Sequence, residues 1–563
     1  MPMPEIITRE RDPAAYATLI GVGVDARMAR LYAARGVRDA SDLNHAFSAL
    51  LPPPQLARIG EAATLLANAT QAGKRLLIVA DFDADGATAC ALGMRALSAM
   101  GATVEFIVPN RFEYGYGLTP EIVALAAERE PHLIITVDNG IASVEGVAEA
   151  NRRGIEVLVT DHHLPGQTLP DASVIVNPNQ VGDTFGSKHL AGVGVIFYTM
   201  LALRAELRDR GHFTTRPEPN LADLLDLVAL GTVADVVRLD HNNRILVQQG
   251  LQRIRAGRVT PGIRALMQVA GREPSRASAY DLGFVVGPRL NAAGRLEDMS
   301  LGIECLLAHD ERTALELAGR LDQLNRQRRS IEADMQVDAL ATLETVDVGS
   351  RYSLALFDAG WHQGVVGILA SRIREKTHRP VIAFARDGAG NLKGSGRSIG
   401  GFHLRDALDL VTKREPALIS KFGGHAMAAG LTIAEAAMGD FAAAFEAVAR
   451  RMLSPADLVE RIETDGTLDG GELDFEFVNA IDAQVWGQGF VAPAFVGSFR
   501  VVEQRVVGEK HLKLKLAIGN TSFEAMRFGS PDSLPASIDA VFRPSINEFR
   551  GNRTLQLILD HVA

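Results

Sequence analysis

Four short motifs in this chain carry side chains that commonly bind divalent metal ions. They are Asp81-Phe82-Asp83-Ala84-Asp85-Gly86, Asp138-Asn139-Gly140, Asp161-His162-His163, and Asp235 at the end of Leu230-Gly231-Thr232-Val233-Ala234-Asp235. Three of the four directly follow an apolar run that is typical of a buried strand. Carboxylates that meet at strand ends repel one another unless a cation neutralises them. The motifs therefore predict a divalent-metal site, and a cluster this acidic is typical of two-ion sites that act on phosphate.

The individual motifs differ in how strongly they indicate a metal. Alternate aspartates in the first motif point the same way in an extended segment, and the preceding strand disfavours a solvated acidic loop. A calcium loop is disfavoured because no bidentate acid follows at the required spacing. Asp138-Asn139-Gly140 alone is an ordinary turn signal, and Asp235 alone is ambiguous. The adjacent histidines supply one nitrogen ligand and one possible phosphate donor, and carboxylates with an imidazole suit Mn²⁺ or Mg²⁺ better than Zn²⁺.

The elements that must position these motifs are strands that alternate with helices. We expect strands at 75–80, 103–108, 132–137 and 155–160, a helix from the first acidic motif to about Met100, and a helix that begins at Thr119-Pro120-Glu121. Continuous apolar strands separated by helices predict a parallel sheet that is covered on both faces. Ligands of such sheets bind beyond the carboxyl ends of the strands, so Asp81, Asp138 and Asp161 should converge on one edge.

The length of 563 residues predicts several domains. We divide the chain into a helical lead-in (1–55), an α/β catalytic domain (56–310), a connecting helix (311–346), a smaller α/β domain (347–455) and a β-rich domain (456–563). The last domain contains alternating runs such as His511-Leu512-Lys513-Leu514-Lys515-Leu516, which predict a small barrel or sandwich.

Composition sets limits on compartment and partners. The chain has two cysteines, no apolar run long enough to span a bilayer, and no apolar signal core in residues 1–13, so we expect a cytoplasmic protein without a membrane partner. A net charge of −10 argues mildly against a nucleic-acid partner. This argument is weak, because a site with many carboxylates subtracts charge that bound cations restore.

The combination of motifs resembles the DHH phosphoesterase superfamily, whose name comes from Asp161-His162-His163. The segments Gly117-Leu118, Leu190-Ala191-Gly192-Val193-Gly194 and 287–295 further resemble the RecJ family of single-strand-specific DNA exonucleases. Gly394-Ser395-Gly396-Arg397-Ser398 and the glycine-rich segment 423–430 resemble the DHH-associated substrate-binding domain, and the β-rich tail resembles the oligonucleotide-binding fold of the same family. The resemblance extends from about residue 25 to the end. One departure is the segment 486–493, where the family has a turn rich in Pro, Gly and Asn.

The resemblance implies roles for individual residues. The implied metal ligands are Asp81, Asp83, Asp85, Asp138, His162 and Asp235. Asp83, Asp138 and His163 are implied as catalytic, with Asp138 bridging two Mn²⁺ or Mg²⁺ ions and His163 touching the scissile phosphate. The implied substrate contacts are Arg111, Arg289, Arg295, Ser395, Arg397, His403 and His425, although Arg289 and Arg295 could instead be structural ion-pair partners. The implied strand contacts of the tail are Lys510, Lys513, Lys515, Arg527, Phe528, Arg543, Phe549, Arg550 and Arg553.

The function implied by the resemblance is metal-dependent 5′-to-3′ exonuclease action on single-stranded DNA, with release of 5′-mononucleotides in recombination and repair. Single-strand-binding protein and a helicase are the implied protein partners. Two alternatives remain open: a DHH phosphoesterase that acts on short oligoribonucleotides, and a non-catalytic DNA-binding scaffold.

Overall fold

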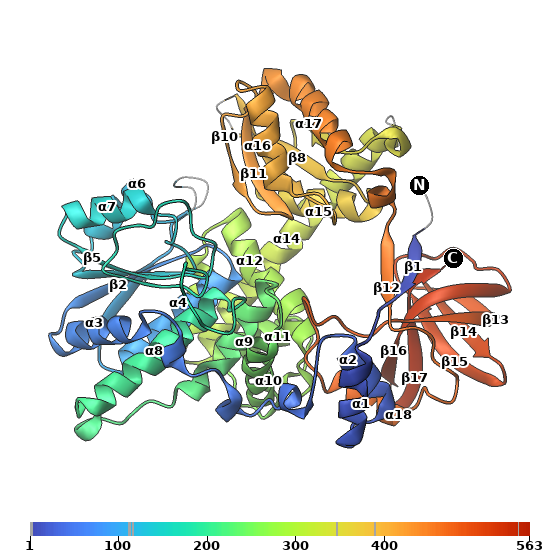
Figure 1. Cartoon of the computed structure of the whole chain (residues 1–563), viewed down its shortest axis with the longest axis horizontal. Helices are drawn as coiled ribbons and strands as arrows, with labels where there is room; N and C mark the ends of the chain where they lie inside the picture. The colour runs from blue at the N-terminus through green and yellow to red at the C-terminus, as the bar shows by residue number, and fades with distance from the viewer. Residues whose placement is uncertain are drawn as a thin grey trace.

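The computed structural model describes residues 4–110, 114, 117–344, 347–387, 390–549 and 551–562, except for the side chain of Phe549. Figure 1 shows three bodies: an α/β body with a helical bundle, a smaller α/β body above it, and a barrel to the right. The long helix α14 connects the first two bodies. Strand β1 (Glu5–Thr8), near the start of the chain, lies beside the barrel, and β17 (Asn552–Val562), near its end, belongs to the barrel.

The first body contains a parallel sheet in the order β3-β2-β4-β5-β6. Its strands are β2 (Arg75–Ala80), β3 (Thr103–Ile107), β4 (Leu133–Val137), β5 (Glu156–Thr160) and β6 (Val174–Val176). The central strands are buried along nearly their whole length, as the continuous apolar runs predicted. The carboxyl ends of β2, β4 and β5 carry Asp81, Asp138 and Asp161.

Helices cover both faces of this sheet. Alternate strand residues such as Leu76 and Ile78 join the core on one face, and Leu77 and Val79 join a separate core on the other. The helices of this body before the bundle are α3 (Ile59–Gln71), α4 (Ala84–Ala99), α6 (Pro120–Ala127), α7 (Val144–Arg152) and α8 (Gly192–Asp209). The predicted cap at the start of α6 is present, because the Thr119 side chain accepts the Ile122 amide at 3.4 Å.

A helical bundle extends this body to the right of the sheet, toward the barrel. It consists of α9 (Leu225–Ala234), α10 (His241–Arg255), α11 (Pro261–Val269), the π-helix η7 (Asp281–Val286), α12 (Gly287–Leu296) and α13 (Ser300–Leu307). The connecting helix α14 (Glu311–Glu344) packs on α11 and α12 with its first half. Near its end, Met335, Ala339 and Leu343 join the core of the second body. One continuous helix thus belongs to two cores, which fixes the spacing of the two bodies.

The second body contains a mixed sheet in the order β10-β11-β9-β8-β7. Its strands are β7 (Leu354–Phe357), β8 (Val381–Arg386), β9 (Asn391–Arg397), β10 (Lys421–Gly424) and β11 (Ala428–Ala434), and its helices are α15 (Val366–Thr377), α16 (Leu404–Arg414) and α17 (Met438–Met452). Strands β9, β10 and β11 include the two glycine-rich motifs. Small residues there let neighbouring side chains pack closely; a β-carbon on Gly394 would lie 2.5 Å from the Phe384 ring.

The third body is a closed barrel in the order β13-β14-β15-β17-β16. Its strands are β13 (Phe495–Val507), β14 (His511–Ile518), β15 (Thr521–Arg527), β16 (Ser537–Phe549) and β17 (Asn552–Val562), preceded by α18 (Phe475–Asp482). Strand β14 alternates as predicted, with Leu512, Leu514 and Leu516 buried inside the barrel. The predicted fold class, a parallel-sheet α/β domain followed by a smaller α/β domain and a barrel, is confirmed.

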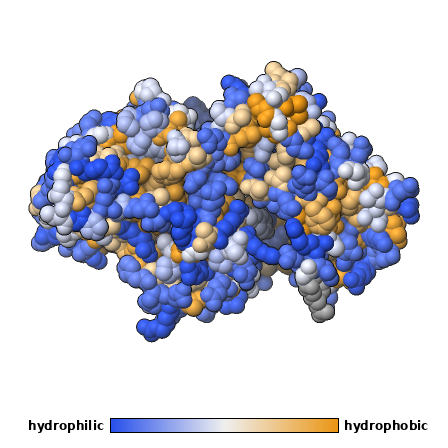
Figure 2. Space-filling model, turned by 90° about the horizontal axis from the view of Figure 1, so that it is seen from below, coloured by the Kyte–Doolittle hydropathy of each residue, from blue (hydrophilic) through white to orange (hydrophobic). Residues whose placement is uncertain are grey.

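The amino-terminal segment packs against the barrel side of the molecule. Strand β1 (Glu5–Thr8) pairs in parallel with β12 (Arg461–Thr464), and α1 (Pro13–Gly21) and α2 (Ala26–Ala33) follow it. Figure 2 shows a largely hydrophilic surface from below, with a shaded recess near its middle. Among the described helices, none has both the length and the apolar composition that a membrane span requires.

Candidate metal centre and strand-binding surfaces

The first acidic motif forms the turn between β2 and α4. Asp83 is the N-cap of α4, where its carboxylate accepts the amides of Asp85 at 2.9 Å and Gly86 at 3.0 Å. A β-carbon on Gly86 would lie 2.5 Å from the carbonyl oxygen of Asp81, so only glycine fits this turn. The cap and the glycine bring Asp81 and Asp83 to the same sheet edge as Asp138.

Asp85 is held by the beginning of another helix. Its two carboxylate oxygens accept the amides of Gly192 at 2.6 Å and Val193 at 2.9 Å, in the first turn of α8. Burial and the neighbouring Asp83 charge raise the pKa of Asp85 to about 7, although these two hydrogen bonds act in the opposite direction. The segment 190–194, noted in the sequence for its family resemblance, therefore orients one of the predicted ligands.

Asp138 lies at the centre of the cluster. It has a positive φ of 62°, and its side chain is only 2% exposed. The adjacent Asn139 holds this turn by donating to the carbonyls of Val79 at 3.1 Å and Val137 at 2.9 Å. Burial, followed by the charges of Asp85 and Asp83, raises the pKa of Asp138 well above its usual value.

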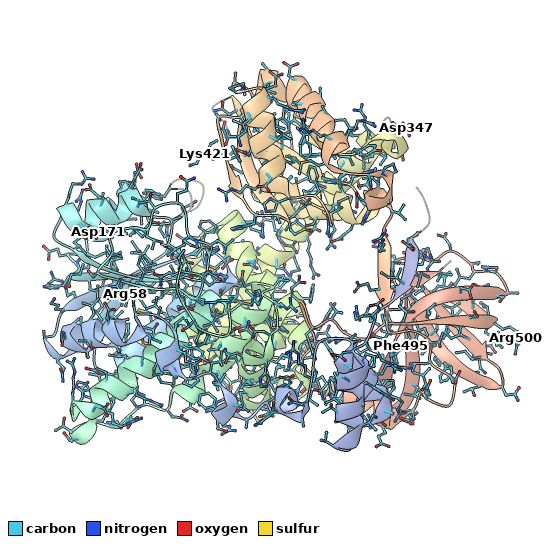
Figure 3. All side chains as sticks on the ribbon, viewed as in Figure 1. Arg58, Asp171, Asp347, Lys421, Phe495 and Arg500 are labelled. Atoms are coloured by element: carbon cyan, nitrogen blue, oxygen red, sulfur yellow. The ribbon has the colours of Figure 1, made fainter. Side chains whose placement is uncertain are left out.

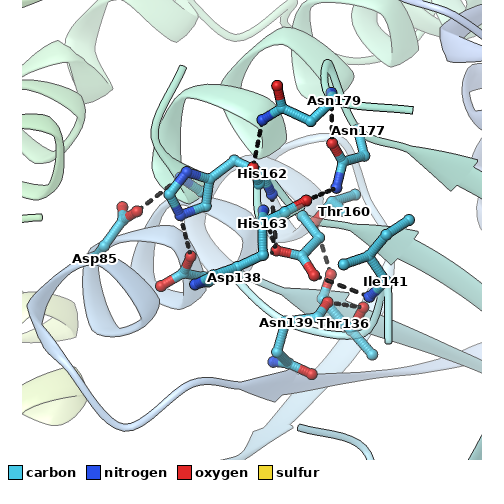
Figure 4. A network of polar contacts seen from close by, with 12 residues as sticks. Asp85, Thr136, Asp138, Asn139, Ile141, Thr160, His162, His163, Asn177 and Asn179 are labelled. Carbon is cyan, nitrogen blue, oxygen red and sulfur yellow. Dashed lines mark hydrogen bonds and ion pairs between the residues drawn. The ribbon is translucent and has the colours of Figure 1, made fainter. Parts of the chain in front are cut away.

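The Asp161-His162-His163 motif separates into an orienting acid and two different imidazoles (Figure 4). Asp161 accepts from the amides of His162 and His163, from the Ile141 amide and from Nδ1 of His163 at 2.7 Å. Burial lowers the pKa of His163, but the Asp161 hydrogen bond and charge outweigh it and raise that pKa to about 9. Burial and the nearby His163 lower the pKa of His162 to about 4, so its imidazole is neutral at neutral pH. A neutral imidazole is the form that binds metals.

Two asparagines that the sequence analysis did not single out support the histidine loop. Asn177 donates to the carbonyl of His163 at 2.9 Å, and Asn179 donates to the carbonyl of His162 at 2.6 Å (Figure 4). They directly follow β6, at the same sheet edge as the acidic motifs. The pattern that indicated the other motifs, polar residues immediately after an apolar strand, could therefore also have indicated these two asparagines.

Asp235 reaches the cluster from the end of helix α9, not from a strand. Its Oδ2 lies 3.5 Å from Nε2 of His162, which is itself 3.1 Å from Oδ1 of Asp138. Burial, followed by the charges of Asp85 and Asp83, raises the pKa of Asp235. All six predicted metal ligands thus meet at one place, although Asp235 was ambiguous in the sequence.

The side chains of the cluster fit a divalent cation. Their ligand atoms form three overlapping groups, and within each group all atoms lie within 4.8 Å of one another. These groups are Asp138 with His162 and His163, Asp85 with His162 and Asp235, and Asp81 with Asp83 and Asp138. Oxygen ligands with one neutral imidazole suit Mn²⁺ or Mg²⁺. A bound cation would also relieve the repulsion that raises the carboxylate pKa values.

The arginines predicted to bind phosphate have different surroundings. Arg289 is 9% exposed, and its Nε and Nη2 lie 3.0 and 2.9 Å from Asp322 on α14, while Nη1 donates to the carbonyl of Val285. This geometry is the structural ion pair named as the alternative for Arg289, and it leaves the guanidinium committed to the protein. Arg111 lies outside the described residues.

Arg295, Ser395 and Arg397 converge on the start of helix α15. Arg295 donates to the carbonyl of Gly364 at 3.2 Å, and a β-carbon on Gly367 would lie 2.8 Å from Oγ of Ser395 and 3.0 Å from Nη2 of Arg397. Arg397 donates to Ser395 at 3.2 Å. Two guanidinium groups from different bodies therefore flank one helix N-terminus, which is favourable for an anion.

The other two predicted substrate contacts also belong to the second body. His403 caps α16 by accepting the Asp406 amide at 3.3 Å. His425 and Lys421 line a cavity of about 570 Å³ whose opposite wall contains Thr119, Ser143 and His163. Figure 3 shows Lys421 at the edge of the second body that faces this wall.

A second cavity of about 570 Å³ lies between the bundle and the barrel, and no sequence motif indicated it. Tyr280 and Phe284 line it, and their rings are stacked with centroids 5.1 Å apart and planes inclined by 21°. They remain 59% and 65% exposed, which is unusual for large aromatic side chains. Arg543 lines the barrel side of the same cavity.

The predicted strand contacts of the barrel are mostly on its surface. Phe528 is 57% exposed, Lys513 pairs with Glu524, and Arg543 pairs with Asp560 at 2.6 Å. Lys510 and Lys515 are exposed, and Arg553 donates to Asn479 at 3.0 Å. Arg550 and the side chain of Phe549 lie outside the described residues.

Comparison with known proteins identifies the family. Three family models match: the DHH family, N-terminal domain, over residues 75–232, the DHHA1 domain over 349–451, and the RecJ OB domain over 464–561. The single-stranded-DNA-specific exonuclease RecJ of Salmonella typhimurium is 51% identical over 547 residues, which cover 95% of this chain and 95% of that protein. The chain belongs to the RecJ family.

Solved RecJ structures share the fold over nearly the whole chain. The structure of RecJ from Thermus thermophilus in complex with Mn²⁺ has a TM-score of 0.83 at 32% identity and covers 99% of this chain and 79% of that one. The complex with Mg²⁺ from the same organism has a TM-score of 0.77 at 30% identity, with coverages of 99% and 78%. The resemblance drawn from the motifs is thereby confirmed. Among the matched family models, the DHH match contains every predicted metal ligand except Asp235.

Proposed function

We propose that this protein is a metal-dependent exonuclease that degrades single-stranded DNA from the 5′ end to 5′-mononucleotides. The observation that carries the proposal is the cluster at the sheet edge. Buried and partly buried carboxylates surround the neutral imidazole of His162, and the charged imidazole of His163 lies beside them. The RecJ relatives are named for this substrate, and solved RecJ structures contain Mn²⁺ or Mg²⁺.

The residues of the cluster divide into ligands and a phosphate donor. Asp81, Asp83, Asp85, Asp138, His162 and Asp235 would hold the ions, and Asp138 belongs to two of the three ligand groups, as a bridging ligand requires. Bound cations of this kind polarise phosphoryl oxygens and lower the pKa of a coordinated water. Asp161 binds Nδ1 of His163, so the other ring nitrogen of His163 is the one that can donate to a phosphate oxygen.

The 5′-to-3′ direction requires a site for the terminal phosphate. Arg295, Ser395 and Arg397 at the start of α15 are suited to this role, because guanidinium groups and a helix N-terminus both favour a dianion. The site lies between the first and second bodies. A strand bound there by its end can place its first phosphodiester at the metal cluster, and hydrolysis then releases a mononucleotide.

Preference for single strands is supported by the second cavity and the barrel. Bases stack on exposed aromatic rings only when they are not paired in a duplex, and Tyr280 and Phe284 provide two such rings next to Arg543. Barrels of the oligonucleotide-binding type bind single strands in the same way. We propose that the strand passes from the barrel across this cavity to the metal cluster.

The cellular role follows from the same proposal. We infer a cytoplasmic enzyme of recombination and repair that works with single-strand-binding protein and a helicase. We also propose that 56–310, 347–455 and 456–563 are its catalytic, substrate-binding and nucleic-acid-binding units, connected by the helix at 311–346 and preceded by the lead-in at 1–55.

The direct test uses purified protein with Mn²⁺ on three 5′-labelled substrates: single-stranded DNA, blunt duplex DNA and a trinucleotide of RNA. Release of labelled 5′-mononucleotides from the single strand, with little from the duplex, is the expected result. Turnover restricted to the short RNA would replace the proposal with an oligoribonucleotide phosphoesterase. Tight DNA binding without turnover would favour a non-catalytic scaffold.

A further inference from the structure

Residues 486–490, between α18 and the barrel, pack against residues 238–239, which follow Asp235 closely in the chain. The amide of Leu239 donates to the carbonyl of Gln488 at 2.7 Å. A β-carbon on Gly487 would lie 2.6 Å from Cδ1 of Leu239, and one on Gly489 would lie 2.4 Å from Cγ of Arg238. The two glycines therefore let residues 487–489 lie directly against residues 238–239.

A residue with a strained backbone lies between Asp235 and this contact. Val236 directly follows Asp235 and has a φ of 62°, a left-handed conformation that is strongly disfavoured for a β-branched side chain. Such a residue keeps this conformation only when surrounding contacts impose it. On one side, Gly283 and Gly287 pack against Val233 and Ala234 at the end of α9. On the other side, the contact with 487–489 holds the chain three residues beyond Val236.

A stack of aromatic and cationic side chains holds residues 486–490 in place. Trp486 and Phe490 stack with centroids 5.1 Å apart and planes inclined by 13°. The Arg35 guanidinium lies 5.2 Å from the Trp486 ring, and that of Arg244 lies 4.2 Å from the Phe490 ring. The two arginines come from different parts of the molecule: Arg35 follows α2 of the lead-in, and Arg244 belongs to α10 of the bundle.

Both arginines are buried, which shows that they are part of the structure and not a solvated surface. The Arg35 side chain is 2% exposed, binds Asp465 through two hydrogen bonds of 2.8 Å, and donates to the carbonyl of Val491 at 2.7 Å. Arg244 is 6% exposed, and within the described part of the chain its Nε has no hydrogen-bond partner. Its Nη1 and Nη2 donate to the carbonyls of Leu239 at 3.3 Å and Asp42 at 3.0 Å, and the face of Phe490 adds a cation–π contact.

We propose that the segment 486–490 is a positioning element for the metal centre: through Leu239 and the strained Val236, it fixes where the Asp235 carboxylate lies. The inference rests on the metal site proposed above. It assigns a second role to the region matched by the RecJ OB domain, because this region then supports metal binding as well as the strand. It also gives a use to the segment at which the sequence departs from the family pattern.

The test measures Mn²⁺ binding to the full-length protein by calorimetry, without DNA and without reference to turnover. Phe490→Ala removes the ring under Arg244 and should weaken Mn²⁺ binding about tenfold, the range typical for supports of metal ligands. Phe490→Tyr keeps the ring and should bind Mn²⁺ within about twofold of the unmodified chain. Phe477→Ala, a matched loss of a buried phenylalanine in α18, should lower the melting temperature without changing Mn²⁺ affinity.

A double variant separates positioning from general stability. Glycine adopts a φ of 62° without strain. In Val236→Gly, the position of the Asp235 carboxylate should therefore depend less on the contact between residues 487–489 and 238–239. Val236→Gly added to Phe490→Ala should recover most of the lost Mn²⁺ affinity. Unchanged Mn²⁺ affinity in Phe490→Ala, equal weakening in Phe477→Ala, or no recovery in the double variant would overturn the inference. Absence of Mn²⁺ binding to the unmodified chain would instead overturn the proposed function as well.

If Phe490→Ala does not fold, Arg244→Met gives the same test from the other side of the ring. It removes the charge while keeping an apolar side chain of similar length, and it should weaken Mn²⁺ binding in the same direction. Mn²⁺ affinity equal to that of the unmodified chain in a folded Arg244→Met variant would overturn the inference.

Discussion

The metal cluster and the surfaces proposed to bind the strand are built in different ways. Asp81, Asp138 and Asp161 follow strands of one sheet, and short backbone hydrogen bonds within one body fix them. The proposed phosphate site joins Arg295 of the bundle to Arg397 of the second body, and the aromatic cavity lies between the bundle and the barrel. Apart from Asp235, which we propose is positioned by the segment 486–490, the chemistry is thus assigned to a rigid edge, while recognition is assigned to junctions between bodies. Substitutions in the two regions should therefore affect different steps.

The largest expected effect is in the cluster. Asp138→Asn removes a central ligand charge and should reduce turnover roughly thousandfold, because metal ions supply several kcal/mol to phosphoryl transfer. Binding of single-stranded DNA should remain within about twofold, since the recognition surfaces are elsewhere. Single-turnover release of label and filter binding measure the two quantities. Asp171→Asn, an exposed acid on the same body, is the control, and near-normal turnover in Asp138→Asn would remove the division between the regions.

The next effect concerns the terminal phosphate. Arg397→Met should reduce kcat/KM for 5′-phosphorylated strands roughly 10- to 100-fold, because a charged hydrogen bond contributes about 1.5–3 kcal/mol. Strands with a 5′-hydroxyl should be affected much less. The ratio of kcat/KM for the two substrates is the measurement, with the exposed Arg414→Met of the same body as control. An equal loss on both substrates would show that Arg397 does not recognise the terminal phosphate.

A smaller effect is expected at the aromatic cavity. Phe284→Ala should raise the Kd for single-stranded DNA about tenfold, because base stacking contributes about 1–3 kcal/mol per base. The rate at saturating DNA should change little, since the cluster is intact. Fluorescence anisotropy measures the Kd, and Tyr16→Ala on α1, which does not line the cavity, serves as an aromatic control. A lower saturated rate with unchanged Kd would place Phe284 with the chemistry instead.

The smallest effect is a linkage between metal, pH and stability. The pKa of Asp85 is raised to about 7, so its protonated form favours folding of the metal-free protein, and this contribution is lost as pH rises from about 4 to about 7. Metal binding requires the ionised carboxylates, so Mn²⁺ should stabilise more at pH 8 than at pH 5. Scanning calorimetry with saturating Mn²⁺ or with chelator should show a difference of about 5 °C at pH 8 and less at pH 5. A larger difference at pH 5 would contradict the sign of the shift.

The sequence predicted the rigid edge better than the junctions, for physical reasons. An apolar run followed by an acid marks the end of a parallel strand, so β2, β4 and β5 and their aspartates could be placed along the chain. Asp235 stayed ambiguous because it ends a helix, where no strand marks its direction. Asn177 and Asn179 follow β6 by the same rule and could have been found.

The junctions between bodies depend on contacts between residues far apart in the sequence, which local sequence patterns do not reveal. Whether Arg289 meets a phosphate or Asp322 is decided by the packing of α12 on α14, and the structure has the ion pair. Phe284 lies in the apolar run 282–286, which is typical of a core, and Tyr280 lies two residues before that run, so their exposure could not be foreseen. The pairing of β1 with β12 joins segments more than 450 residues apart, and two strands of four residues carry no signal of each other.

We propose that six side chains together hold a pair of divalent ions: Asp81, Asp83, Asp85, Asp138, His162 and Asp235. Anomalous scattering from crystals of the unmodified protein grown with Mn²⁺ tests it directly. We expect two Mn²⁺ peaks at the carboxyl edge of the sheet, with Asp138 coordinating both ions and Asp235 coordinating at least one. Absence of Mn²⁺ at this edge, or a single ion that Asp138 does not touch, would contradict it.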